Sequence, residues 1–430
     1  MSTQARTIAF HTLGCKLNFS ETATISRDFI DRGYMIVNAK SVSDIYVINT
    51  CSVTDNADKE CRKIVRQVKR RNPIAVVAMV GCYAQLKPEE LAESTGADIV
   101  LGTAEKFQLL DTLESYEKTH EPIIIRTKTE NLNAFTSSYS ASERTRVFLK
   151  IQDGCDYPCT YCTIPMARGK SRNDSIEKTV KLAKEIGKTE AMEIVLTGVN
   201  IGDFGVSTSE TFFDLIQELD KIDGIDRIRI SSIEPNLLTD DILDYIKDSR
   251  TFVHHFHIPL QSGSNKILSD MKRRYRRELF ADRVHSIKER FPDACIGADV
   301  IVGFPTESVV DFEDAYRFIT NLDIEYLHVF SYSERSGTLA ADYSQSVTVE
   351  EKAERSKRLR ILSEKKRSIF HDRFRNQTLP VLFEAIRGDQ LMGHTKNYIQ
   401  VYADGIPEMI NKILPVKLYK NMGRSMKGNI

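Results

Sequence analysis

Long apolar runs, an apolar signal core and a net charge are all missing from this sequence of 430 residues. No apolar stretch is long enough to span a bilayer, so we expect no membrane-spanning helix. The first residues, MSTQARTIAFHT, contain no signal core, and we therefore expect a cytoplasmic protein. Lys and Arg number 60, as do Asp and Glu, so a nucleic-acid surface would have to come from local basic clusters.

Cysteine is scarce, but three of the eight cysteines stand together in the run GCDYPCTYC: Cys155, Cys159 and Cys162. Without export, metal ligands or free thiols are expected rather than disulfides. The spacing C-x3-C-x2-C has no fourth cysteine nearby, whereas a closed zinc site needs four ligands. Three thiolates on a cubic 4Fe-4S cluster leave one iron open to hold a small molecule. A zinc knuckle is the alternative for such a short motif.

Residues 1–117 alternate short apolar runs with helical patterns. The strands are TIAFHTLGC, DIYVINTC, IAVVAMVGC and ADIVLG, with helices expected near residues 18–31 and 58–71. Strands that alternate with helices predict an α/β domain with a doubly wound parallel sheet.

Three of these strands end in a cysteine: Cys15, Cys51 and Cys82. Because the carboxyl ends of parallel strands form one ligand edge, we expect a second three-thiolate site there. A buried core cysteine is the alternative for each of them, and it is the expectation for Cys61 and Cys295.

A polar segment at residues 118–145 is expected to be a linker. In residues 146–372 six strands alternate with helices: RVFLKI, EIVLTG, RIRISS, HHFHIPL, CIGADVIVGF and YLHVFSY. This pattern predicts a partial (β/α)6 barrel of the TIM type, with its site at the carboxyl-end mouth. The three-cysteine loop follows the first strand and therefore lies at that mouth.

Residues 374–430 are rich in β-forming pieces and predict a small β-barrel. Basic residues without any acid mark its last part, at Lys412, Lys417, Lys420, Arg424 and Lys427. A basic stripe on a small barrel suits a nucleic-acid backbone. The alternative is a basic tail that serves solubility.

Several ordered words, among them TLGCKLN, NTCSVT, VGCYAQ, CTIPMARGKSR, HIPLQSGS and DVIVGFPTE, resemble the methylthiotransferases of the radical S-adenosylmethionine (SAM) superfamily. The resemblance covers the whole chain and implies an N-terminal methylthiotransferase domain, a radical SAM core and a C-terminal TRAM domain. It implies that Cys155, Cys159 and Cys162 hold the 4Fe-4S cluster that cleaves SAM to a 5′-deoxyadenosyl radical. A second, auxiliary 4Fe-4S cluster would be the sulfur source, held by Cys15, Cys51 and Cys82.

The family has three branches, which the word around the first cysteine separates. Lys16 and Leu17 after Cys15 resemble the branch that modifies N6-threonylcarbamoyladenosine at position 37 of tRNA. The isopentenyladenosine branch usually has Gln-Met there, and the branch that modifies a ribosomal-protein aspartate usually has Pro-Lys. These two branches remain the alternative enzymatic functions. An iron–sulfur RNA-binding sensor is the alternative without enzymatic activity. The free carboxylate of threonylcarbamoyladenosine would need cationic donors, for which Lys16 and Arg168 are candidates.

The same resemblance implies SAM contacts at Tyr161, Thr197, Gly198, Asn200, Ser232, Glu234, Gln261, Ser262, Gly303 and Arg168. Asn18 is expected beside the auxiliary site or as a helix cap. Arg172 is a candidate for a phosphate or carboxylate. His254, His255 and His257 are expected to line a core or pocket rather than to bind metal.

The expected partners are a tRNA anticodon stem-loop, a reducing electron donor and a sulfur donor. We expect the chain to act as a monomer.

Overall fold

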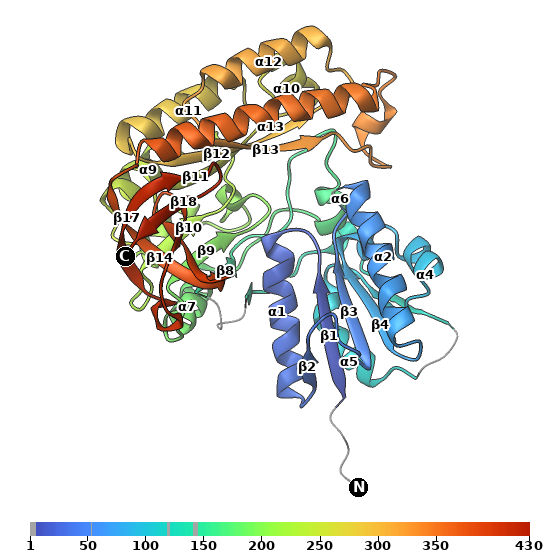
Figure 1. Ribbon diagram of the computed structural model, residues 1–430. Helices are drawn as coiled ribbons and strands as arrows, with labels where there is room; N and C mark the ends of the chain where they lie inside the picture. The colour runs from blue at the N-terminus through green and yellow to red at the C-terminus, as the bar shows by residue number, and fades with distance from the viewer. Residues whose placement is uncertain (1–5, 53, 118–120, 141–144) are drawn as a thin grey trace. The chain divides into compact units, whose positions relative to one another are not determined.

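The computed structural model describes residues 6–52, 54–117, 121–140 and 145–430 (Figure 1). The chain forms two compact units. The first consists of residues 1–141, 148–174 and 333–341, and the second of residues 142–147, 175–332 and 342–430. Within the described residues, no helix has the length and apolar character needed to cross a membrane.

A six-stranded parallel sheet forms the centre of the first unit, in the order β2-β1-β3-β4-β5-β6. Its strands are β1 (Thr7–Thr12), β2 (Met35–Val37), β3 (Ile45–Thr50), β4 (Val76–Gly81), β5 (Ile99–Leu101) and β6 (Ile123–Ile125). Every residue of β3 and β4 is buried, as expected for central parallel strands. The doubly wound sheet is confirmed. It continues past residue 117, because β6 pairs in parallel with β5.

Helices cover both faces of this sheet, because alternate residues of its strands point to opposite sides. Ile45 and Val47 pack with α1 (Lys16–Asp31) and α5 (Leu109–Glu114). Tyr46 and Ile48 pack instead with α2 (Asp55–Arg71) and α4 (Pro88–Thr95), which Figure 1 shows on the other side from α1. The remaining elements are α3 (Cys82–Leu86), η1 (Glu105–Gln108), η2 (Thr129–Asn131), β7 (Ser138–Tyr139) and α6 (Ile164–Arg168).

The order of residue types explains where α2 begins and ends. The Thr54 hydroxyl accepts a hydrogen bond from the Ala57 N–H at 3.2 Å and so caps the helix. Asp55 and Asp58 lie in the first turn, and three basic residues lie in the last turn. Both groups of charges are favourable to the helix dipole.

Parallel strands also organise the second unit. The strand β8 (Arg146–Lys150) begins in this unit, next to β9 (Glu193–Thr197). Just before the two strands, the Met192 N–H donates to the Thr145 carbonyl at 2.9 Å. The next strands are β10 (Arg227–Ile230), β11 (His255–Gln261), β12 (Cys295–Val302) and β13 (Tyr326–Ser331). β9 pairs with β10, isolated bridges join β10 to β11, and β11-β12-β13 form one sheet. The six expected strands are therefore confirmed.

Helices alternate with these strands. They are α7 (Ile176–Gly187), η3 (Ile201–Asp203), α8 (Phe212–Leu219), α9 (Asp240–Asp248), α10 (Asn265–Asp270), α11 (Arg277–Arg290), α12 (Val309–Asn321) and α13 (Val349–Asp372), with η4 (Leu339–Asp342) before the last. Figure 1 shows α13 running along β13, and the Ser363 hydroxyl accepts from the Leu327 N–H at 2.8 Å.

The chain ends in a closed five-stranded barrel, which confirms the small β-barrel that the tail predicted. Its strands are β14 (Thr378–Arg387), β15 (Gln390–Thr395), β16 (Gln400–Ala403), β17 (Ile413–Asn421) and β18 (Met426–Asn429), with η5 (Pro407–Met409) between β16 and β17. Arg227 of β10 donates to the His394 carbonyl at 2.8 Å and to the Pro380 carbonyl at 3.2 Å, which joins the barrel to the parallel strands.

Candidate active site

Three cysteines lie at the carboxyl edge of the first sheet. Cys15 follows β1 and precedes α1, Cys51 directly follows β3, and Cys82 directly follows β4. The strands β1, β3 and β4 are neighbours in the sheet, so three thiols from distant parts of the sequence come to one edge. Cys15 is exposed, whereas Cys51 and Cys82 are buried.

Gly14 shows how closely these loops approach. A Cβ atom at Gly14 would lie 2.8 Å from the Cys51 Sγ, and its φ is +91°. Glycine is therefore required before Cys15, both for this backbone conformation and for the close packing against Cys51.

Asn18 holds the edge together instead of capping α1. Its side-chain amide donates to the carbonyls of Leu13, at 2.7 Å, and Thr50, at 3.1 Å. These two residues precede Cys15 and Cys51 in their loops. The Thr50 hydroxyl in turn accepts from the backbone N–H of Tyr83, which follows Cys82, at 3.1 Å. The backbones around all three cysteines are thus connected by hydrogen bonds.

The second set of cysteines lies in the loop between β8 and α6, also in the first unit. Cys155, Cys159 and Cys162 are all half-buried. Backbone N–H groups point at two of the sulfurs: the Tyr157 N–H at the Cys155 Sγ and the Ile164 N–H at the Cys162 Sγ, both at 3.4 Å. Such contacts favour thiolates, since they place donors where negative charge accumulates.

The two cysteine sets are neighbours within this unit. Thr163, next to Cys162, donates its hydroxyl to the carbonyl of Ser52, next to Cys51, at 3.5 Å. Thr103 donates to the Ala167 carbonyl at 2.9 Å and so joins the end of β5 to α6. Tyr161, the expected SAM contact in the cysteine loop, is half-buried.

A buried charge network lies below both sets, and sequence analysis missed most of it. Arg168 is 1% exposed and donates to both carboxylate oxygens of Glu21, to Asp153 at 2.9 Å and to the Asn18 amide oxygen at 2.8 Å. Lys106 and Lys150 also pair with Glu21, at 2.5 and 3.0 Å.

This network changes the interpretation of Arg168. We expected it to meet a carboxylate of SAM or of the substrate, but its terminal N–H groups are bound by this chain's own acceptors. Arg172, the second candidate, donates to the Ala134 carbonyl at 2.8 Å and lies 3.3 Å from Asp153. In the sequence, two acidic residues near the cysteines were the only indication of this buried charge network. Glu21 follows Asn18 by three residues on one helix face, and Asp153 precedes Cys155 by two.

Electrostatics keep Glu21 and Arg168 charged. Burial favours neutral groups, but the Arg168, Lys106 and Lys150 cations outweigh it and hold the pKa of Glu21 well below its usual range. Burial lowers the pKa of Arg168, yet Cys82, Glu21 and Asp153 raise it above its ordinary value. Two carboxylates thus face four basic side chains, counting Arg172, and burial lowers the pKa of one of these, Lys106.

The remaining expected SAM contacts belong to the second unit, where they follow the carboxyl ends of four strands. Thr197, Gly198 and Asn200 end or follow β9, Ser232 and Glu234 follow β10, Gln261 and Ser262 end or follow β11, and Gly303 follows β12. Two backbones here have positive φ: Gly303, at +72°, and Gln261, at +63°. A left-handed conformation is costly for glutamine and typical of functional sites.

Several of these residues have partners within the chain, among them Asn200, whose side-chain amide donates to Asp203 at 2.8 Å. Glu234 is 8% exposed and forms an ion pair with Arg273. Burial raises the pKa of Glu234, and the negative charges of Asp203 and Asp299 raise it further, against the effect of Arg273. A Cβ at Gly303 would collide with the Lys352 side chain, so the close neighbour of this glycine is part of the protein.

Each cysteine set offers three thiols, the ligand set expected for an iron–sulfur cluster. None of the eight cysteines, all of which lie in the described residues, forms a disulfide. In the part of the chain that the structure describes, the one group of three ligand atoms within 4.8 Å of one another consists of two histidines and an aspartate, not of cysteines. The sulfurs therefore do not converge on a single ion as in a zinc site. Thiolates of an iron–sulfur cluster bind separate irons and need no such convergence.

Comparisons with known proteins agree with this arrangement. The model of "Uncharacterized protein family UPF0004" matches residues 7–102, and that of the "Radical SAM superfamily" matches residues 149–319. The fold and the cysteine loop thus define a radical SAM protein, a class that uses SAM and an iron–sulfur cluster.

Curated relatives define the family more closely. Threonylcarbamoyladenosine tRNA methylthiotransferase MtaB of Bacillus subtilis is 40% identical, over 96% of this chain and 94% of its own. The protein of the same name from Aquifex aeolicus is also 40% identical, over 94% of this chain and 98% of its own. The chain belongs to this family of methylthiotransferases. The tRNA-2-methylthio-N(6)-dimethylallyladenosine synthase of Clostridium tetani is 30% identical, over 99% and 96%.

A solved structure shares the fold. The radical SAM methyltransferase TsrM from Kitasatospora setae, with cobalamin and a [4Fe-4S] cluster bound, superposes with a TM-score of 0.58 and 12% identity. It covers 79% of this chain and 77% of its own. At this identity the likeness concerns the fold alone.

Proposed function

We propose that this protein transfers a methylthio group to carbon 2 of N6-threonylcarbamoyladenosine at position 37 of tRNA. The observation that carries the proposal is the presence of two neighbouring three-cysteine sets in one unit, in a chain 40% identical to the MtaB enzymes along nearly its whole length. One set alone would suit a radical SAM enzyme that only generates a radical. Two sets suit an enzyme that also inserts sulfur.

Each set has its own task in this proposal. Cys155, Cys159 and Cys162 would hold the 4Fe-4S cluster that serves SAM cleavage, and Cys15, Cys51 and Cys82 would hold the auxiliary cluster. When bound, the two groups supply an electron for SAM cleavage and a sulfur atom for transfer. The protein's own share is positioning: the N–H groups of Tyr157 and Ile164 orient two thiolates, and Asn18 keeps the loops of Cys15 and Cys51 in register.

SAM would bind across the strand ends of the second unit. Thr197, Gly198, Asn200, Ser232, Glu234, Gln261, Ser262 and Gly303 remain the proposed contacts there. Tyr161 remains a proposed SAM contact in the cysteine loop of the first unit. We do not include Arg168, because its N–H groups are engaged by Glu21, Asp153 and Asn18. Its role in this proposal is to position the two cysteine loops.

The substrate assignment is supported by the relatives and by Lys16. This residue is the first of α1, is exposed, and directly follows Cys15. A cation at this place suits a substrate with a free carboxylate, since a charge-assisted hydrogen bond contributes about 1.5–3 kcal/mol. The isopentenyl group is apolar and would gain nothing from it.

We place tRNA backbone contacts on the C-terminal barrel. Lys417, Lys420 and Arg424 are exposed, and Lys420 lies directly opposite Lys427 on the neighbouring strand. Like charges opposite one another destabilise a strand pair, so an anion such as phosphate would relieve their repulsion. The site of action would be the cytoplasm, with the enzyme as a monomer and with separate donors of electrons and sulfur.

A competition assay tests the proposal. The cluster-loaded enzyme is offered two anticodon stem-loops that differ only in carrying threonylcarbamoyl- or isopentenyladenosine, and the nucleosides are analysed by mass spectrometry. We expect methylthiolation of the threonylcarbamoyl form. Preferred turnover of the isopentenyl form, or of a ribosomal protein offered alongside, would reject the substrate assignment.

A Cys51→Ala variant tests the mechanism separately. It should lose methylthiolation but keep SAM cleavage to 5′-deoxyadenosine, because Cys155, Cys159 and Cys162 are untouched. A Cys61→Ala variant is the matched control, since Cys61 is buried in the core under the same sheet. Normal methylthio product from Cys51→Ala would contradict the assignment of the auxiliary set.

A further inference from the structure

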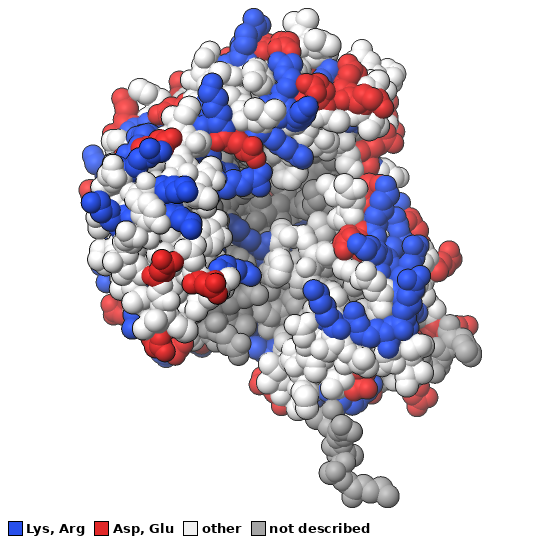
Figure 2. All heavy atoms as spheres, viewed as in Figure 1, with Lys and Arg blue, Asp and Glu red and all other residues white. Residues whose placement is uncertain are grey.

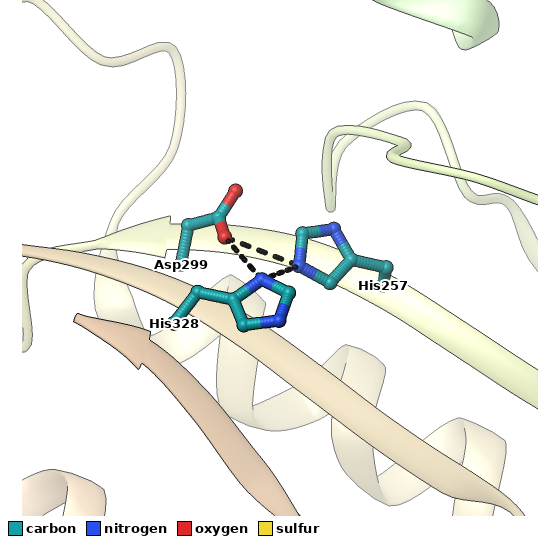
Figure 3. A group of neighbouring side chains, drawn as sticks. All are labelled: His257, Asp299 and His328. Carbon is teal, nitrogen blue, oxygen red and sulfur yellow. Dashed lines mark hydrogen bonds and ion pairs between the residues drawn. The ribbon is translucent and has the colours of Figure 1, made fainter. Parts of the chain in front are cut away.

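Three polar side chains from successive strands of the second unit point at one another (Figure 3). They are His257 of β11, Asp299 of β12 and His328 of β13. The His257 Nε2 lies 3.1 Å from the Asp299 Oδ1, the His328 Nδ1 lies 3.2 Å from the same oxygen, and the two ring nitrogens are 3.2 Å apart.

Strand register explains the meeting. Asp299 and His328 are direct partners in the parallel pair β12-β13, and His257 is paired with Gly297, two residues before Asp299. Residues two apart in a strand share a face, so all three side chains emerge on the same face of the sheet. Their separation in sequence, up to 71 positions, hides the cluster from motif analysis.

Hydrogen bonds can hold this triangle, because both ring N–H groups can donate to the Asp299 Oδ1. When these two ring nitrogens carry no proton, the same three atoms each offer a lone pair to one bound ion. For metal–ligand bonds of about 2.1 Å, tetrahedral or octahedral ligands lie roughly 3.0–3.4 Å apart, which includes the observed distances.

Charges of both signs surround the triangle. Asp203 and Glu234 are buried carboxylates within electrostatic range of one another, and Glu234 is also within range of Asp299, while Arg273 pairs with Glu234. His328 keeps about half of its side chain exposed, at 52%, and lines a cavity of about 170 Å³, which Arg367 and Arg424 also line. An ion would therefore be reachable from solvent and would keep positions for water or another oxygen ligand.

We infer that His257, Asp299 and His328 form a binding site for one divalent transition-metal ion, separate from the cysteine sets. Two imidazoles and one carboxylate are borderline ligands that suit Zn²⁺, Fe²⁺ or Mn²⁺. Three protein ligands leave the coordination open, as in sites where the ion binds a further ligand. This inference revises the expectation that His257 only lines a core or pocket. His255 agrees with that expectation, because it is hydrogen-bonded to the Tyr326 hydroxyl at 2.8 Å.

Manganese is the probe of choice, because it prefers nitrogen and oxygen ligands over thiolates. The full chain, loaded with its clusters in their oxidised, diamagnetic form, is freed of other metals with EDTA. It is then titrated with Mn²⁺, and the free ion is followed by electron paramagnetic resonance. We expect one Mn²⁺ per wild-type chain, displaced by one equivalent of Zn²⁺.

Variants locate the ion. Asp299→Asn and His328→Gln should lose this equivalent, whereas His285→Gln should keep it, because His285 is an exposed histidine of α11 paired with Glu289. Circular dichroism checks that each variant is folded. A wild-type chain that takes up neither Mn²⁺ nor Zn²⁺ overturns the inference without any variant, as does equal uptake by wild type and both folded variants. Neither result bears on methylthiolation, which the stem-loop assay measures separately.

Discussion

Glu21 and Arg168, 147 positions apart in the chain, form a two-pronged ion pair in the interior of the first unit, with both N–O distances at 3.1 Å. Glu21 is on the helix that begins after Cys15, and Arg168 ends the helix that begins after Cys162. The pair therefore joins the segments that carry the two cysteine sets. Because both groups are buried, neither can lose its partner without a large penalty.

Removing one partner should destabilise the protein strongly. We expect Glu21→Gln to lower the free energy of unfolding by about 3–5 kcal/mol, since three cations would lose their shared carboxylate. Urea unfolding of the full chain measures this. Arg32→Gln, which breaks an exposed pair with Glu114, is the control and should cost less than about 1 kcal/mol. Equal effects of the two variants would show that the buried network does not hold the unit together.

Iron content should separate the two cysteine sets. We expect about eight irons per chain after anaerobic reconstitution, because two 4Fe-4S clusters would be bound. Replacing Cys155, Cys159 and Cys162 together by Ala should leave roughly four, held by Cys15, Cys51 and Cys82. A folded triple variant without iron would contradict two independent sites. Cys295→Ala, in the core beside the barrel, should keep the full content.

Salt dependence should reveal the RNA surface. Replacing Lys417, Lys420, Arg424 and Lys427 by Gln should make the slope of log tRNA affinity against log salt concentration less steep. The slope should change by up to about three to four, at roughly 0.7–0.9 per lost phosphate contact. The measurement is the slope of log affinity against log salt concentration.

A second basic surface provides the comparison. Figure 2 shows Lys and Arg side chains gathered over α2, where Lys59, Lys63, Arg66 and Arg70 are exposed. Replacing these four α2 residues by Gln should leave the slope of log tRNA affinity against log salt concentration nearly unchanged. If instead the α2 variant flattens it and the barrel variant does not, the RNA backbone lies along α2.

Acid should destabilise the chain partly through His371. Burial and the nearby Arg367 guanidinium lower the pKa of His371 to about 4, below the ordinary value of 6.5. The unfolded chain therefore binds this proton more readily. The contribution of His371 to the free energy of unfolding is fully present above about pH 6.5. It is lost as the pH drops toward 4, by up to about 3 kcal/mol in all.

His371→Gln should reduce that fall. Urea midpoints between pH 7.5 and 4.5 would show it, with His285→Gln as the exposed control that leaves the fall unchanged. If His371→Gln follows the same pH profile as the wild type, the histidine titrates normally in the folded state.

Much of the fold follows from local patterns. Buried apolar runs such as those of β3 and β4, alternating with helical segments, are sufficient to predict the doubly wound sheet, because parallel strands need helical crossovers. Strand ends can also be predicted. The position of Cys15, Cys51 and Cys82 directly after three strands was enough to predict that they share an edge, since the carboxyl ends of parallel strands face one way.

Other features depend on contacts between distant residues, which no local pattern contains. From the sequence, Arg168 was expected to bind a carboxylate of SAM or of the substrate. Only the tertiary structure shows that it pairs with Glu21 and Asp153 instead. Likewise, His257 stood out in a histidine-rich strand, but its partners Asp299 and His328 reach it through strand register. The sequence by itself determined the strands, the helices and the cysteine loops. Tertiary packing decided which buried charges pair, because an ion pair depends on distances that only the folded chain sets.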